Sequence, residues 1–140
     1  MNMINKILNF FNLEKKKNFS DHENVTLLLG QIHSKLNSNL ESNNINDYEF
    51  KAFSQWGEDG IIDYLVSNLN IENKTFIEFG VETYQESNTK YLLLNRNWKG
   101  LIIDSSKKNI SIIKKSSIYW KYSLTAIRSF ITKENINQLI

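Results

Sequence analysis

Two apolar patterns with helical spacing occupy the first 36 residues. Residues 1–18 predict a short amphipathic helix that ends in a basic run, and residues 20–36 predict a second helix capped by Ser20 or Asp21. Their apolar positions are Ile4, Ile7, Leu8 and Phe11, then Val25, Leu28, Leu29, Ile32 and Leu36. A polar, Asn-rich segment follows. We therefore expect residues 1–50 to form an N-terminal helical extension with a linker, and residues 51–140 to form the functional domain.

From residue 58 onward, helical patterns alternate with short apolar runs that are typical of strands. Strands are predicted at residues 75–79, 101–104 and 118–122, and helices at residues 58–70, 89–96, 107–115 and after a Thr132 N-cap. Glu58 and Asp59 lie in the first turn of the first of these helices, where the helix dipole favours negative charge. This order predicts an α/β fold with a doubly wound parallel sheet, truncated after about three strands.

Composition narrows the classes of function. Hydrophobic residues make up 41% and charged residues 23%, as in ordinary globular domains. The net charge of +2 comes without a concentrated basic patch, so nucleic-acid binding is not expected. Because Cys is absent, disulfides, thiolate metal sites and a Cys nucleophile are excluded. His22 and His33 have no second ligand at metal spacing, so no metal is predicted.

The hydropathy profile favours a protein of the cytoplasm. No apolar run approaches the ~20 residues that a membrane helix needs. The N-terminus lacks the apolar core and cleavage site of a signal peptide. The apolar face and cations of residues 1–18 also fit a membrane-surface anchor, but packing against the domain or a partner is favoured, and no membrane is expected.

The strand predicted at residues 75–79 carries a carboxylate at Glu78, two residues before Gly80. In an open parallel sheet, ligands bind beyond the carboxyl ends of the strands, where Glu78, Gly80 and Asp104 are expected. Gly80 permits a tight turn and close approach of a ligand to the backbone. Asp104 follows Gly80 by 24 residues, near the ~20-residue offset of an acid that binds a ribose diol. These positions predict a site for an adenosine-containing cofactor.

The residues around Gly80 distinguish between such cofactors. The G-x-G-x-x-G loop that cradles a pyrophosphate is absent, and Glu78 and Glu82 would repel phosphates. The same acids suit a ligand that carries an amino group and a sulfonium, as S-adenosyl-L-methionine does. Structural roles are the alternative for each candidate: Glu78 as a sheet-edge acid, Asp104 as the first residue of a loop, and Asn88 as a helix cap.

Four segments, in chain order, resemble the FkbM-like family of S-adenosylmethionine-dependent methyltransferases: FSQWGEDGII, FIEFGVETYQESNT, NRNWKGLIIDSS and YSLTAIRSFIT. The similarity covers residues 53–140. It implies the Rossmann-like class I methyltransferase fold and O-methylation of a sugar or secondary-metabolite hydroxyl. The cofactor-binding residues that it implies are Glu78, Gly80, Asn88 and Asp104, with Gln55 and Glu58 near the methionine end.

The predicted elements depart from the family's pattern in one respect. Class I methyltransferases have a seven-stranded sheet, whereas three strands are predicted here, so no catalytic base can be named. The first strand would also be an exposed edge, open to self-association or to a second chain. The leading hypothesis is the cofactor-binding half of a methyltransferase with a small-molecule or glycan acceptor. The alternative is a catalytically inactive remnant, or an assembly partner without enzymatic activity of its own.

Overall fold

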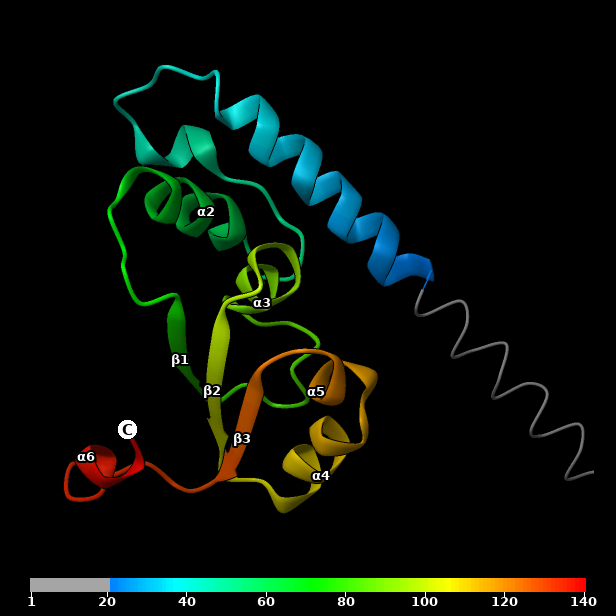
Figure 1. Cartoon of the computed structure of the whole chain (residues 1–140), viewed down its shortest axis with the longest axis vertical. Helices are drawn as coiled ribbons and strands as arrows, with labels where there is room; N and C mark the ends of the chain where they lie inside the picture. The colour runs from blue at the N-terminus through cyan, green and yellow to red at the C-terminus, as the bar shows by residue number, and fades with distance from the viewer. Residues whose placement is uncertain (1–20) are drawn as a thin grey trace, which may run out of the picture.

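A three-stranded parallel sheet forms the centre of the computed structural model, which describes residues 21–140 (Figure 1). Its strands, in spatial order, are β1 (Thr75–Phe79), β2 (Lys99–Asp104) and β3 (Leu124–Arg128). Helical segments are residues 21–37, η1 (Ile45–Tyr48), α2 (Glu58–Asn68), α3 (Lys90–Arg96), α4 (Lys107–Lys115), α5 (Ser117–Lys121) and α6 (Ile136–Leu139). The predicted α/β class and the parallel sheet of three strands are confirmed.

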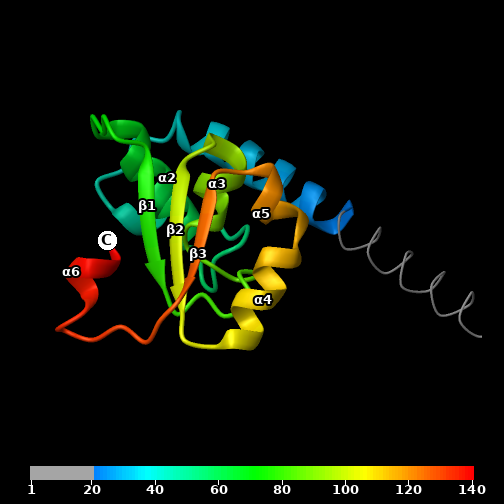
Figure 2. The same ribbon diagram turned by 60° about the horizontal axis from the view of Figure 1, so that its bottom comes forward.

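The register of the sheet brings the ends of the three strands together. Phe79 pairs with Ile103, and Asp104 pairs with Arg128. Figure 2 shows the strands side by side, with their arrowheads toward the same end of the domain. The chain segments that follow the strands therefore start from one edge of the sheet, where a ligand of an open parallel sheet binds.

The main hydrophobic core lies between one face of the sheet and the helices α3 and α4. It contains Phe76 of β1, Ile102 of β2, and Leu124 and Ala126 of β3, packed with residues that include Leu92, Leu93, Ile110 and Ile113. Strand residues of alternating position face this core because side chains alternate across a strand. On the opposite face, Ile77 is 41% exposed and Phe79 is 45% exposed. One face of the sheet is thus much better covered than the other.

One predicted strand is wrong. Residues 118–122 lie mainly in the helix α5, and the third strand is Leu124–Arg128. The side chains of Ile118, Tyr119 and Tyr122 pack against the core, whereas Trp120 is 72% exposed. Tyr119 and Tyr122 follow Ile118 by one and four residues, which is the spacing of one face of a helix. The sequence nevertheless predicted a strand, because bulky and aromatic residues have a high β propensity. The residues after Tyr122 consequently belong to β3 rather than to a ligand-binding strand end.

The last helix starts later than predicted. Its N-cap is Asn135, and Thr132 instead opens the preceding turn, where its carbonyl oxygen accepts hydrogen bonds from Asn135 and Ile136. The helix predicted for residues 1–18 and the Ser20 cap lie outside the described residues. The helix predicted for residues 20–36 is confirmed over its described part.

The polar segment before the domain is packed rather than extended. Tyr48 is buried and stacks on Tyr64 of α2 with ring centroids 3.7 Å apart. The N–H of Gly60 donates to the carbonyl oxygen of Phe50. Part of the predicted linker therefore covers α2. Over residues 21–140, no helix combines the length and apolarity needed to cross a bilayer.

We predict that Gly60→Ala destabilises the fold by about 2–4 kcal/mol, because the added methyl group overlaps backbone atoms that cannot rotate away. A Cβ at position 60 would lie 2.1 Å from the carbonyl oxygen of Tyr48 and 2.3 Å from the nitrogen of Phe50. Urea denaturation followed by circular dichroism measures the change. Lys108→Ala, at an exposed position of α4, is the control. Equal stability of the two variants would contradict the packing of residues 48–50 on α2.

Candidate functional site

The structure brings Glu78, Gly80 and Asp104 to the same edge of the sheet, as predicted. Glu78 lies in β1, Asp104 is the last residue of β2, and the N–H of Gly80 donates to the carbonyl oxygen of Ile103 at 2.9 Å. Gly80 has a φ of +68°, a left-handed conformation that favours glycine. A Cβ at this position would meet no atom within 4 Å, so the backbone of Gly80 borders open space.

The carboxylate of Glu78 binds the loop that leads into α3. Its Oε2 accepts hydrogen bonds from the Ser87 hydroxyl and from the Thr89 hydroxyl and N–H, and its Oε1 accepts one from the Asn88 N–H at 3.0 Å. Sequence reasoning assigned Asn88 to the cofactor site but did not pair Glu78 with these donors. A polar Ser-x-Thr stretch after an acid in a strand is the only signal that could have identified them. Glu78 thus fixes the shape of the loop after β1.

Asn88 binds the Glu78 carboxylate through its backbone N–H and not through its side chain. The N-cap of α3 is Thr89, whose own side chain does not cap the helix, so the interpretation of Asn88 as a helix cap is wrong. The Asn88 side chain is exposed, next to the carboxylate that binds its N–H. The residue lies in the predicted site without a contact that assigns a role to its amide.

The carboxylate of Asp104 joins the loop after β1 to the loop after β2. Its Oδ2 accepts from the Glu82 N–H at 2.9 Å, and its Oδ1 accepts from the Ser106 N–H at 2.8 Å and from the Asn109 amide at 3.3 Å. Asp104 is buried. It therefore starts a loop, as the structural alternative holds, and it also reaches the loop that carries Gly80.

The loop between Gly80 and α3 is held in a strained conformation. Glu82 and Tyr84 have φ values of 49° and 61°, and Tyr84 is 2% exposed. A bulky residue in this region is an outlier that costs about 1–3 kcal/mol. Burial of the Tyr84 ring and the hydrogen bond from Glu82 to Asp104 hold the loop in place. Such strain is concentrated at binding sites and switch regions.

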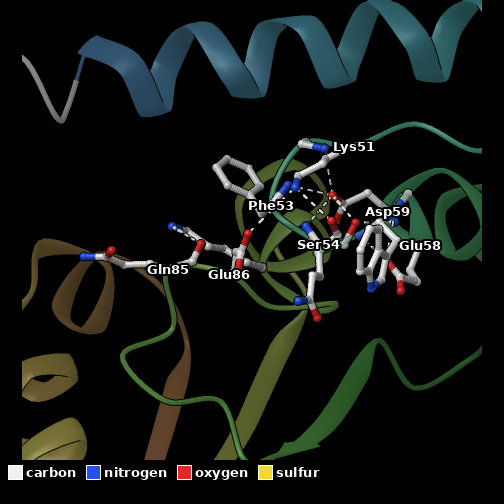
Figure 3. Close-up of polar contacts among 12 residues, drawn as sticks. Lys51, Phe53, Ser54, Glu58, Asp59, Gln85 and Glu86 are labelled. Atoms are coloured by element: carbon white, nitrogen blue, oxygen red, sulfur yellow. Dashed lines mark hydrogen bonds and ion pairs between the residues drawn. The ribbon is translucent and has the colours of Figure 1, made fainter.

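Asp59 organises the segment before α2 (Figure 3). Its Oδ2 accepts from the N–H groups of Ala52, Phe53 and Ser54 and from the Ser54 hydroxyl, at 2.6–2.9 Å. Burial raises the pKa of this carboxyl, and the three N–H donors act in the opposite direction. Its buried Oδ1 has no hydrogen-bond partner in the described structure. Asp59 is consequently a structural acid of a tight loop, not a simple first-turn acid.

Glu58 and Gln55 lie in the same segment. The Oε2 of Glu58 accepts from the N–H groups of Gly57 and Trp56, and the Gly57 N–H is the main reason that the pKa of Glu58 is lowered. Gln55 has an exposed side chain, and its carbonyl oxygen accepts a hydrogen bond from Lys51 at 2.8 Å. Glu58 therefore stabilises the turn before α2.

The segment 51–57 contacts the loop after β1. The Ser87 N–H donates to the carbonyl oxygen of Phe53 at 2.9 Å, and the Lys90 ammonium lies 4.7 Å from the centre of the Phe53 ring. Lys90 is 4% exposed and forms an ion pair with Glu23 at 2.7 Å. Sequence reasoning missed this buried Lys. The structure thus places the loop of Gln55 beside the loop that Glu78 fixes.

The two candidate acids keep some capacity for a ligand. A carboxylate oxygen can accept about two hydrogen bonds, and both Oε1 of Glu78 and Oδ2 of Asp104 accept one. Each acid can therefore accept one further bond from an ammonium or hydroxyl group. The open backbone of Gly80 lies between the ends of these two strands.

A polar cleft of about 930 Å³ lies elsewhere, between the helix of residues 21–37, α2 and α3. Asp63 in its wall accepts from Ser34 at 2.5 Å and from Arg96 at 2.7 Å. Arg96 ends α3 just before β2 begins, so this cleft borders the amino ends of the strands. None of the candidate residues lines it.

No family model matches the chain, and no curated protein matches it. The resemblance in the four sequence segments and the cofactor assignment therefore stay predictions, to be tested by binding.

We predict that Asp59→Ala destabilises the fold by roughly 3–5 kcal/mol, because three buried N–H groups and a hydroxyl lose their acceptor. Glu58→Ala removes two hydrogen bonds at a more accessible position, and we expect a loss of about 1 kcal/mol. Urea denaturation of both variants measures the difference. A loss for Asp59→Ala no larger than that for Glu58→Ala would show that Asp59 does not organise this segment.

Proposed function

We propose that residues 51–140 form the cofactor-binding part of an S-adenosyl-L-methionine-dependent methyltransferase. Its acceptor would be a hydroxyl group of a small molecule or glycan, as the sequence resemblance implies. The observation that supports the proposal is the arrangement of two acids on adjacent parallel strands around the open backbone of Gly80. This is the edge of the sheet where ligands of open α/β folds bind.

The residues at this edge fit the polar groups of the cofactor. The free acceptor position on Oε1 of Glu78 suits its amino group, and that on Oδ2 of Asp104 suits a ribose hydroxyl. Gly80 leaves room for the ligand to approach the backbone. Gln55 and Asn88 lie on the two neighbouring loops, and Glu58 is the first residue of α2. When bound, the cofactor supplies an electrophilic methyl group.

The internal hydrogen bonds of the acids support such a role. A binding group is effective when its neighbours hold its side chain in one orientation, because little entropy is then lost on binding. Glu78 accepts four hydrogen bonds and Asp104 accepts three, so both carboxylates are already oriented. Each acid would thus have two functions: it fixes a loop, and one of its oxygens can accept a further hydrogen bond from the ligand.

A second candidate function is assembly without catalysis. β1 is an edge strand of the described sheet, and its side chains Ile77 and Phe79 are about half exposed. An unpaired edge with apolar residues is suited to pairing with another strand. This function predicts a folded protein that does not bind the cofactor.

Titration calorimetry of the full chain tests the proposed function. We expect saturable binding of S-adenosylmethionine and S-adenosylhomocysteine and none of NAD, because the pyrophosphate cradle is absent. Gly80→Asn should weaken this binding by at least ~10-fold, since its side chain fills the open space over the backbone. Asn tolerates a positive φ, so the variant should stay folded.

Alanine variants of the two acids are less informative by themselves. Glu78→Ala and Asp104→Ala remove ligand contacts and also release loops, so their stability must be measured alongside binding. Equal affinity of Gly80→Asn and the parent chain would refute the placement of the cofactor at this edge. A folded parent chain without any cofactor binding would refute the methyltransferase proposal and favour assembly.

A further inference from the structure

The helix of residues 21–37 contacts the domain through Leu27, Gly30, the His33 ring and several polar side chains. Gln31 donates to Asn95 at 2.9 Å, and Ser34 donates to Asp63 at 2.5 Å. Gly30 is buried, and a Cβ there would lie 2.7 Å from the Tyr91 ring, so the helix and the domain approach closely at this point. The domain thus occupies one face of the helix.

Five of the apolar residues of this helix lie on the other face, whereas Leu27 packs against the domain. Val25 and Leu29 are each 54% exposed, Ile32 is 57% exposed and Leu36 is 63% exposed. Leu28, beside them, is 57% exposed. Figure 1 shows the helix crossing the edge of the domain, with one side free of other described elements. These five residues form the exposed stripe.

The spacing within the stripe is that of a coiled coil. Val25, Leu29, Ile32 and Leu36 follow one another at intervals of four, three and four residues, which is the a/d repeat of two-stranded helical packing. The domain contacts Gln31, Ser34 and Gly30, which fall at other positions of the same repeat. A helix can therefore pair through the stripe without releasing its own domain.

The stripe is complementary to itself. If two copies run antiparallel about a two-fold axis between residues 30 and 31, Val25 of one copy meets Leu36 of the other, and Leu29 meets Ile32. Every layer of the resulting seam is aliphatic, and no charged side chain falls within it. Self-complementarity of this kind is what a two-fold interface requires.

The charges of the helix disfavour a lipid surface as the occupant. Amphipathic helices that bind membranes carry many Lys and Arg residues on the polar face. Residues 21–37 contain the acids Asp21 and Glu23 and one strong base, Lys35, and Glu23 is already paired with Lys90. A second copy of the stripe is entirely apolar, so its binding needs no basic residues on the helix.

We propose that two copies of this chain associate through an antiparallel pair of the helices formed by residues 21–37, with the exposed stripe as the interface. With five stripe residues from each copy, the interface is smaller than a standard specific interface, which has about 20–30 residues a side. We therefore expect a dissociation constant on the order of micromolar. The pairing is independent of the proposed cofactor, because the stripe and the sheet edge share no residue.

Analytical ultracentrifugation of the full chain over a range of concentrations tests the pairing. The parent should show a monomer–dimer equilibrium, and Leu29→Glu and Ile32→Glu should raise the dissociation constant by at least ~10-fold, as expected for the centre of an interface. Both positions are more than half exposed, so the variants should retain the parent's circular dichroism spectrum.

Two control variants separate this surface from others. Phe130→Glu alters a side chain that is 75% exposed and lies outside the stripe, and Ile77→Glu alters the open face of β1. Both should dimerise as the parent does. A parent that is monomeric at all concentrations would overturn the proposal. The stripe would then have another occupant, such as residues 1–20 or a lipid. Dissociation by Ile77→Glu but not by Leu29→Glu would assign the interface to the sheet instead.

Cross-linking tests the orientation, since the chain contains no Cys and single Cys variants give unambiguous disulfides. In the antiparallel pair, Val25→Cys and Leu36→Cys chains should form covalent dimers when they are mixed and oxidised, but not when each is oxidised alone. Efficient disulfide formation by either variant alone would establish a parallel pair and overturn the proposed arrangement.

Discussion

The hydrogen bonds of the Glu78 carboxylate are the interaction on which the candidate site depends. A carboxylate in a strand at the edge of a small sheet would ordinarily turn toward water. Here two hydroxyl groups and two N–H groups from residues 87–89 surround it. The bonds hold the loop after β1 against the sheet and place the start of α3, which in turn covers the core. Loss of this contact would affect the loop, the helix and the open backbone of Gly80 together.

Buried acids organise the other loops of the domain in the same way. Asp104 binds the N–H of Glu82 and the loop before α4, and Asp59 binds three successive N–H groups before α2. Charge-assisted hydrogen bonds are stronger than those between neutral groups, so a few carboxylates can fix loops that lack regular structure. A small domain thereby gains rigid loops at the edge of the sheet where a ligand is proposed to bind.

The apolar side chains left exposed among the described residues include those on the face of the sheet at Ile77 and Phe79, and those of the stripe on the helix of residues 21–37. These two surfaces differ in physical character. The sheet surface adjoins an unpaired strand and is suited to strand addition. The stripe has the spacing of a helical seam and is complementary to itself. A chain with both can hold a second copy through its helix while the sheet edge stays available.

The sequence by itself determined the α/β class, the first two strands, most of the helices and the meeting of Glu78, Gly80 and Asp104 at one edge. These features follow from local periodicity and from the fact that parallel strands end together. Only the tertiary structure decided that residues 118–122 are mainly helical, because local β propensity was outweighed by packing on the core. It alone also assigned donors to each acid and turned Val25 and Leu29 away from the domain. Both outcomes depend on contacts between residues far apart in sequence, which no local pattern records.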